Sequence, residues 1–323
     1  MKKKYIIRKL LTAIPTFLIA TIILFSLLHI APSGPVEIMV RSSGKTMDPG
    51  MIEELRSQYG LDKPLHQQYF RWLSNFFTGD LGYSYVTNQR LNSILPEKIL
   101  LTLELVLVAN VFSVAFAVVL GVIAAVRKNS FLDNFLSSFA LFTYSMPLFW
   151  VGLLALYVFS LKLGLTPVGG VTSLGKDFTG FAAIADNLYH LILPASVLSL
   201  AYLAYYFRLI RSSMLDVLNK EYVVAARAKG VKELAVIFKH ALRNALLPLI
   251  TLFAVSLGFV LAGSVVIETI FGWPGLGRFL VTAAFNRDYT ALLSLNAIIV
   301  IMVLFANLVA DIACAYVDPR IKY

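Results

Sequence analysis

The sequence predicts an all-α polytopic membrane protein with six transmembrane helices. Of its 323 residues, 59% are hydrophobic and only 14% are charged. Apolar runs of about 20 residues recur along the chain, which is the length that a helix needs to cross a hydrocarbon core roughly 30 Å thick. A soluble fold could not bury so many such runs, so we expect one membrane domain.

The apolar runs define the order of the predicted elements. The first run follows a basic amino terminus and resembles a signal peptide, but its core exceeds the usual length of about 7–15 residues and has no small-residue cleavage site. We therefore interpret residues 1–31 as an amino terminus and an uncleaved first helix. Residues 99–317 form a five-helix core, and residues 318–323 form a tail. The six predicted spans are 10–31, 99–126, 135–161, 188–207, 244–267 and 289–317.

Lysine and arginine predict the orientation of these spans. One side of the membrane carries 17 of the 28 Lys and Arg residues, including those of the amino terminus and of the loop at about 212–243. Since basic residues concentrate in short cytoplasmic loops, we expect both termini and this loop in the cytoplasm. The net charge of +10 fits this asymmetry and an attraction to anionic membrane lipid, so it gives no reason to expect nucleic acid as a partner.

A sizeable extracytoplasmic segment, residues 32–98, follows the first span. Within it, "DPGMIEELRSQYG" predicts a helix with Asp48 as its cap, Pro49 in the first turn and Gly60 at its end. The aromatic stretch "YFRWLSNFFTG" comes next. The segment is too apolar for a free tail, so we expect it to fold back over the outer face of the membrane.

Catalytic and metal-binding patterns do not emerge. "GKT" at 44–46 is not a phosphate-binding loop, because the glycine required five residues earlier is Met39. The four histidines are scattered, and the single cysteine, Cys314, lies in the last apolar run. We expect neither an enzyme nor a metal or cofactor site in this chain. Glu104, in the second span, either lines a watery pathway or bonds to a neighbouring helix.

The basic loop between the fourth and fifth spans contains "VVAARAKGV" at 223–231. It predicts a helix through Lys229, a break at Gly230 and Val231, and a second helix from about Lys232. The alanines make a thin helix that could enter a groove of a partner protein, with Arg227 and Lys229 paired to acids there. Alternatively, alanine simply favours helix, and the basic residues bind lipid headgroups.

Several motifs resemble one transporter family. "EYVVAARAKGV" followed by "HALRNALLP" is similar to the EAA loop of permease subunits of binding-protein-dependent ABC transporters, in the form typical of oligopeptide and dipeptide permeases. "YGLDKPLHQQYFRWL", "GDLGYSY", "FGWPGLGRF", "RDY" and "DPR" resemble the first permease subunit of that family. One position departs: the glutamate expected before the two alanines is Val224, and the nearest acid is Glu221.

The resemblance implies an ABC importer type I permease fold in a prokaryotic plasma membrane. The expected partners are a homologous second permease, two ATPase subunits that bind ATP and Mg²⁺, and an external solute-binding protein. Peptides are the implied substrate, and relatives also carry nickel chelates, glutathione or sugars. The competing classes are a secondary transporter, which needs charges in its spans, and a non-transporting membrane scaffold or receptor.

The resemblance also implies two sets of site residues. The ATPase-coupling loop comprises Glu221, Ala225, Ala226, Arg227, Lys229 and Gly230. The "WPGLGR" loop either forms an outer vestibule that receives the binding protein or holds the spans together. Its residues are Trp273, Pro274, Gly275, Gly277 and Arg278.

Overall fold

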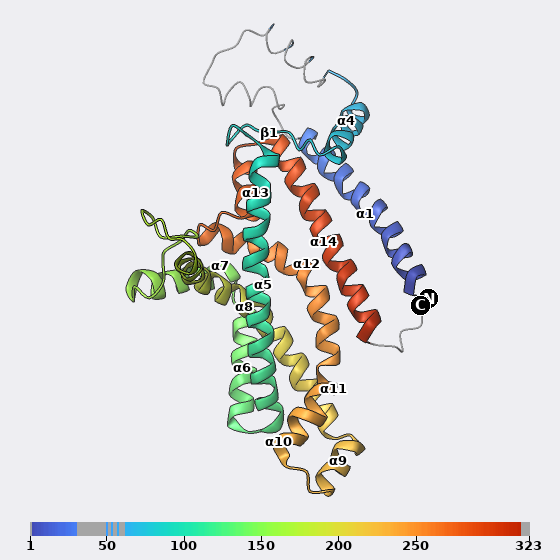
Figure 1. Ribbon diagram of the computed structural model, residues 1–323, viewed down its shortest axis with the longest axis vertical. Helices are drawn as coiled ribbons and strands as arrows, with labels where there is room; N and C mark the ends of the chain where they lie inside the picture. Colours follow the sequence, from blue (N-terminus) through green and yellow to red (C-terminus); the bar gives the residue numbers. More distant parts are fainter. Residues whose placement is uncertain (1, 31–49, 51–52, 54–56, 58–61, 318–323) are drawn as a thin grey trace.

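The protein is elongated, with different elements at the two ends of its long axis (Figure 1). The computed structural model describes residues 2–30, 50, 53, 57 and 62–317. The helix α9 lies at one end, and α4, α13 and a short hairpin lie at the other (Figure 1). The helix predicted at 48–60 falls almost entirely outside the described residues.

Nearly all regular structure is helical, as predicted. Two strands form one antiparallel hairpin in which Tyr83 pairs with Arg90 and Ser84 with Gln89. Two helical segments, η1 and η2, are π-helices. In chain order the elements are α1 (Lys2–Ile30), α4 (Leu65–Phe77), β1 (Tyr83–Ser84), β2 (Gln89–Arg90), α5 (Leu91–Val126), α6 (Phe131–Ser145), α7 (Leu148–Ala155), η1 (Leu156–Lys162), α8 (Phe181–Leu218), α9 (Glu221–Ala228), α10 (Glu233–Ala235), η2 (Val236–Leu242), α11 (Arg243–Ala245), α12 (Leu247–Ile270), α13 (Leu276–Phe285) and α14 (Tyr289–Val317).

Within the described part of the chain, four helices are long and apolar enough to cross a membrane, or five if the bent pair α6 and α7 is one span. The four are Leu11–Ile30 of α1, α5, α8 and Tyr289–Val309 of α14. The 24-residue helix α12 covers the predicted fifth span. The count of six spans therefore stays a prediction.

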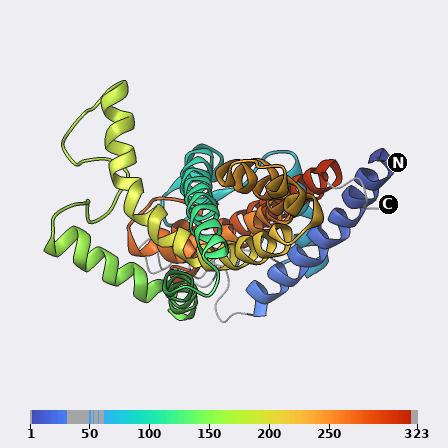
Figure 2. The ribbon, with the colours of Figure 1, turned by 90° about the horizontal axis from the view of Figure 1, so that it is seen from below.

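The predicted third span, 135–161, is bent near its middle. The helix ends at Ser145 and restarts at Leu148 with a bend of 102°. Pro147 explains the break, because a proline ring forces the preceding residue out of the helical conformation, and Met146 has an extended ψ of 136°. As a result α7, η1 and the start of α8 project sideways from the bundle (Figure 2).

Two long helices, α5 and α8, pack against each other along the middle of the bundle (Figure 1). At Gly121 of α5 there is no room for a side chain, since a Cβ there would lie 2.8 Å from Cγ2 of Ile210 on α8. Two buried hydrogen bonds join the same helices: Ser113 donates to the Ser199 carbonyl at 2.7 Å, and Tyr206 donates to Oδ1 of Asn110 at 3.0 Å. The pair thus forms a spine through the bundle.

A partly buried ion pair attaches α6 to this spine. The Arg211 guanidinium of α8 donates from Nε and Nη2 to both carboxylate oxygens of Asp133, at 2.6 and 2.7 Å. The Asn129 backbone N–H also donates to Asp133, at 2.9 Å. Fork-to-carboxylate pairing of this kind specifies geometry as well as strength. The corner between α5 and α6 is therefore held to α8.

The aromatic helix α4 packs along α1. The Thr21 and Tyr69 hydroxyls share a hydrogen bond of 2.9 Å, and the rings of Phe25 and Tyr69 meet edge to face at 5.5 Å between centroids. Further along, Phe17 contacts the ring of Phe77, with centroids 5.8 Å apart. The aromatic stretch thus folds onto the first helix. Its position relative to the membrane remains a prediction.

Candidate functional site

The predicted break in the basic loop is a helix-ending turn centred on a glycine. Gly230 has a φ of +76°, a left-handed conformation that glycine adopts without steric cost. The Val231 N–H donates to the Ala226 carbonyl at 3.2 Å, and the Gly230 N–H donates to the Arg227 carbonyl at 2.9 Å. This pair of bonds is the Schellman arrangement that closes a helix. A Cβ on Gly230 would meet nothing within 4 Å, so its conformation, and not crowding inside the chain, requires glycine.

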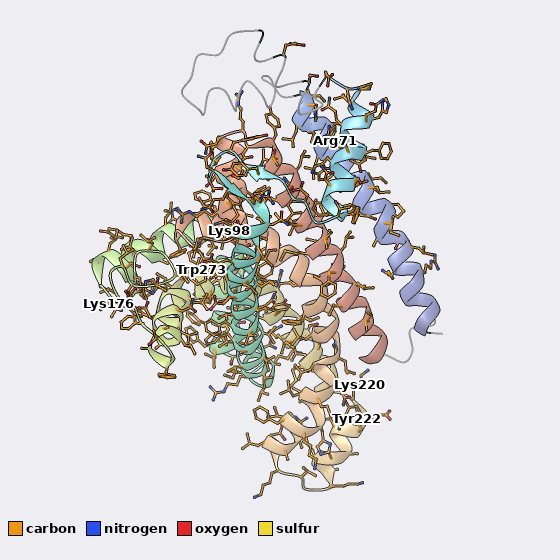
Figure 3. The ribbon with its side chains drawn as sticks, turned by 45° about the horizontal axis from the view of Figure 1, so that its top comes forward. Arg71, Lys98, Lys176, Lys220, Tyr222 and Trp273 are labelled. Carbon is orange, nitrogen blue, oxygen red and sulfur yellow. The ribbon has the colours of Figure 1, made fainter. Side chains whose placement is uncertain are left out.

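The helix α9 has one buried face and one exposed face. Val223 is fully buried and Ala226 nearly so, both against Val236 of the returning segment. On the other side Tyr222 and Val224 are exposed (Figure 3 labels Tyr222), as is Ala225. Of the two alanines expected to meet a partner, Ala225 is therefore available at the surface, whereas Ala226 packs inside the hairpin.

Two polar contacts clamp α9 to the segment that follows it. The Arg227 guanidinium donates to both carboxylate oxygens of Glu233, at 3.1 and 2.7 Å. The hydrogen bond from Arg227 holds the pKa of Glu233 below its usual value. The Asn244 side chain donates to the Tyr222 hydroxyl at 2.9 Å. Arg227 is thus engaged by an acid of its own chain, and the hairpin is braced at both ends.

The "WPGLGR" loop at the opposite end surrounds a buried carboxylate, that of Glu268 on α12. It accepts hydrogen bonds from the Thr102 hydroxyl at 2.7 Å and from the Arg278 N–H at 2.9 Å. The Ser264 hydroxyl and the Gly277 N–H also donate to it. Thr102 in turn accepts from the Leu276 N–H at 2.8 Å. The start of α13 is thereby bound to α5 and α12 through one side chain, an arrangement that we call the Glu268 lock.

The glycines of this loop allow the lock to close. A Cβ on Gly275 would lie 2.5 Å from Oγ1 of Thr102, and one on Gly277 would lie 2.6 Å from Cα of Val265. Both distances are too short for any side chain to fit without movement of the backbone or of the lock itself.

Trp273, labelled in Figure 3, is fully buried beside the lock. Its indole Nε1 donates to the Leu101 carbonyl of α5 at 2.9 Å. Of the five residues predicted for the vestibule, Trp273, Gly275 and Gly277 are internal, Pro274 is partly exposed, and Arg278 is exposed. Arg278 donates from Nη1 to the Gly272 carbonyl at 2.6 Å.

Asp288 of the "RDY" motif joins the strand hairpin to α14. Its carboxylate accepts from the Ser84 hydroxyl at 2.6 Å and from the Ala291 N–H in the first turn of α14 at 3.1 Å. The two partners lie far apart in sequence, so the motif holds the "GDLGYSY" stretch against the last helix.

Glu104 on α5 is half-buried and bonds to the Asn187 side chain at the start of α8. This is the contact with a neighbouring helix that the sequence analysis left open, and a role in lining a pathway stays a prediction. In the described residues, His, Cys, Asp and Glu do not gather in groups of three or more that could hold a metal ion.

Neither Glu268 nor Thr102 could be recognised from the sequence as a partner in this cluster. The only signal in the sequence was a single carboxylate at the end of an apolar run, a few residues before closely spaced glycines.

Comparison with known families matches nearly the whole chain. The family described as "Binding-protein-dependent transport system inner membrane component" matches residues 117–323. The chain belongs to this family. The family of the N-terminal part of such membrane components matches residues 2–106. The resemblance drawn from the motifs is therefore confirmed, and the chain is a transport subunit and not an enzyme.

Curated relatives align over their full length. The chain is 42% identical to the oligopeptide transport system permease protein AppB of Bacillus subtilis, over 99% of both chains. It is 40% identical to the di/tripeptide permease protein DppB of Pseudomonas aeruginosa, over 99% of this chain and 98% of that one. It is 38% identical to the dipeptide permease protein DppB of Escherichia coli K12, over 99% of both.

A solved structure has a similar fold. It is a structure of the MetNI methionine ABC transporter in an inward-facing conformation, with a TM-score of 0.54 and 16% identity. The match covers 70% of this chain and 96% of that one. The two chains thus share a fold over this part.

The Glu268 lock predicts a sharp sensitivity to one methyl group. Gly277→Ala should lower the stability of the folded protein by about 1–3 kcal/mol, the usual cost of overpacking, because the added Cβ meets Val265 and Glu268. Thermal unfolding of the purified protein measures this. Ala284→Ser, at an exposed site of the same helix, is the control and should change little. Equal stability of the two variants would contradict the lock.

The turn after α9 predicts a different pattern at Gly230. Gly230→Ala should destabilise the hairpin by about 1 kcal/mol, because a residue with a Cβ disfavours positive φ. Gly230→Asn should cost less, since asparagine tolerates this conformation. Limited proteolysis of the loop reports the difference as faster cleavage in the alanine variant. If both variants were cleaved at the same rate, the backbone explanation would be wrong.

Proposed function

We propose that the chain forms half of the translocation pathway of an ATP-driven importer of di- and oligopeptides delivered by an external solute-binding protein. The observation that carries this proposal is the full-length similarity to permease proteins named for oligopeptide, di/tripeptide and dipeptide transport. A glutathione permease protein, GsiC of Escherichia coli, is also 37% identical over 99% of the chain. Glutathione, itself a small peptide, is therefore the second candidate substrate.

The exposed face of α9 is the proposed contact with an ATPase subunit. Tyr222, Val224 and Ala225 present a mainly apolar surface at the far end of the molecule. Exposed apolar residues on a projecting element suit a protein partner better than solvent. Val224, at the position of the family's glutamate, makes an apolar contact in this proposal, and Glu221 in the first turn of α9 is the available acid.

The remaining members of the coupling loop support that surface. Ala226 fits α9 against its own hairpin, Arg227 braces the hairpin through Glu233, and Gly230 turns the chain. Lys229 is exposed at the end of α9 and can pair with an acid of the partner. The hairpin would then move as a rigid lever when the ATPases close.

At the opposite end, Pro274 and Arg278 are the proposed contacts with the binding protein, since they reach the surface of the loop. Trp273, Gly275 and Gly277 act indirectly in this proposal: they shape the loop from inside. In this proposal the loop still forms the outer vestibule, but only two of its five residues touch the binding protein.

The complete transporter in this proposal has a homologous second permease, two ATPase subunits that bind ATP and Mg²⁺, and the solute-binding protein. Both termini of this chain and α9 lie in the cytoplasm of a prokaryotic cell, as the distribution of basic residues favours. The chain has six spans, with α6 and α7 forming one bent span and α12 another. Residues 32–98 lie on the outer side.

In this proposal the permease alternates between inward and outward access because ATP binds the two states of the transporter with different affinities. ATP binding stabilises the closed ATPase pair, and the attached α9 hairpins transmit that preference to the spans. A secondary transporter would instead depend on ionisable groups in its spans. Glu104 and Asp133 are each bonded to a neighbouring helix, which favours structural roles for both. Transport that survived ATP depletion and collapsed with the ion gradient would support that rival.

The coupling proposal predicts a selective loss of the ATPases. Ala225→Trp places a bulky ring on the exposed face of α9, so the ATPase subunits should no longer co-purify with the permease, and peptide uptake into vesicles should cease. Ala284→Trp, at an exposed alanine of the opposite end, should retain the ATPases. Both variants should insert and fold. Normal co-purification and uptake with Ala225→Trp would refute the contact.

A further inference from the structure

An irregular segment, which we call the strap, joins the two limbs of the arm that projects sideways from the bundle. It comprises residues 163–180 and connects η1 to α8. Its outer part is exposed: Leu174 is wholly exposed, and Lys176 lies toward the edge of the molecule, away from Trp273 (Figure 3). Its first half, in contrast, is tied to the rest of the protein at three points.

Two of these ties hold the strap to the limbs of the arm itself. The Ser160 hydroxyl of η1 donates to the Pro167 carbonyl and shares a hydrogen bond with the Thr166 hydroxyl, both at 2.9 Å. On α8, the Asp186 carboxylate accepts from the backbone N–H and the hydroxyl of Ser173, at 2.7 and 2.6 Å. The strap, η1 and the start of α8 are therefore bonded into one unit.

The third tie joins the strap to the "WPGLGR" loop, backbone against backbone. The Gly170 N–H donates to the carbonyl of Phe271, two residues before Trp273, at 3.1 Å. A Cβ on Gly169 would lie only 2.5 Å from the same carbonyl oxygen, so the approach requires glycine. We call Gly169, Gly170 and Phe271 the latch. It connects two segments that are far apart in sequence.

The latch is the weaker of the two attachments of this loop. On the other side, the carboxylate of the Glu268 lock accepts bonds from two hydroxyls and two backbone N–H groups. Between the described residues of the strap and of the loop, one neutral hydrogen bond forms, and the half-buried Val171 packs on the cluster around Trp273. A displacement of the loop therefore opens the latch before it opens the lock.

We propose that the latch is a switch that the solute-binding protein opens. Docking at Pro274 and Arg278 draws Phe271 away from Gly170 and frees the arm. The binding protein favours the open latch because it binds that state more tightly, since a ligand shifts an equilibrium only through different affinities. The signal has a direct route to the ATPases, because α8 runs as one helix from Phe181, beside the strap, to Leu218, just before α9. This inference rests on the proposed contact with the binding protein.

A variant with the latch already open tests the proposal. Gly169→Ala places a methyl group against the Phe271 carbonyl, at a residue that lacks the positive φ of Gly170. The full transporter with this change should hydrolyse ATP severalfold faster than wild type without binding protein. The transporter's own binding protein, loaded with dialanine, should then add little. Damage to the fold alone would lower the rate. Val168→Ala, at the exposed neighbouring position, is the control and should behave as wild type.

A distance across the latch gives a readout that does not depend on activity. Spin labels are placed at Ser93→Cys, on the outer end of α5, and at Lys176→Cys on the strap, with Cys314 replaced by serine. In the wild-type transporter the distance should shift when the dialanine-loaded binding protein is added. In the Gly169→Ala variant it should be shifted beforehand.

The outcomes separate this inference from the proposed function. If the binding protein stimulates ATP hydrolysis in wild type but Gly169→Ala keeps the wild-type basal rate and label distance, the latch is refuted and the proposed function stands. A wild-type transporter that the binding protein does not stimulate would contradict the proposed function and the latch with it. Should Gly169→Ala fail to assemble, Val171→Ala loosens the same contact by removing atoms, and an unchanged basal rate there would also refute the latch.

Discussion

The close packing of α5 against α8 is the constraint on which the rest of the structure depends. Gly121 lets the two helices approach until no side chain fits between them, and buried hydrogen bonds join them on the same side. The Glu268 lock and the α9 hairpin, at opposite ends of the molecule, are each attached to one helix of this pair. The Glu268 lock is anchored on α5 through Thr102, and α9 follows directly from α8. A displacement at one end therefore cannot leave the spine unaffected.

The glycine-rich loop at 272–278 is attached to this helix pair through α5. The family resemblance implies that this loop contacts a binding protein. Most of its residues nevertheless face inward, around the carboxylate of Glu268. Burying a charged or polar carboxyl group is costly unless it is hydrogen-bonded, and here Thr102, Ser264 and two backbone N–H groups supply the bonds. The loop is therefore a structural joint between α5, α12 and α13, and its proposed docking surface is limited to Pro274 and Arg278.

Local features of the fold could be predicted from the sequence, and long-range ones could not. The apolar runs indicated the long helices, and the glycine in "RAKGV" indicated the turn at Gly230, because each depends on neighbours in sequence. The break beside Pro147 is also local, because a proline disfavours the helical conformation of the residue before it. The bond between Thr102 and Glu268 spans 166 positions, and the inward face of Ala226 depends on Val236. The spacing of residues within one segment of the sequence does not reveal which residues of distant segments will contact each other.

The central claim is that α9 and the α5–α6 corner form one rigid body through α8, held by Arg211 and Asp133. The most direct measurement is a spin-label distance between Lys128→Cys and Lys229→Cys, with the single native cysteine, Cys314, replaced by serine. The full transporter is measured without nucleotide and with ATP trapped on its ATPases. A rigid connection predicts the same narrow distance distribution in both states. A shifted or broadened distribution on ATP binding would contradict it, because the hairpin would then move independently of the bundle.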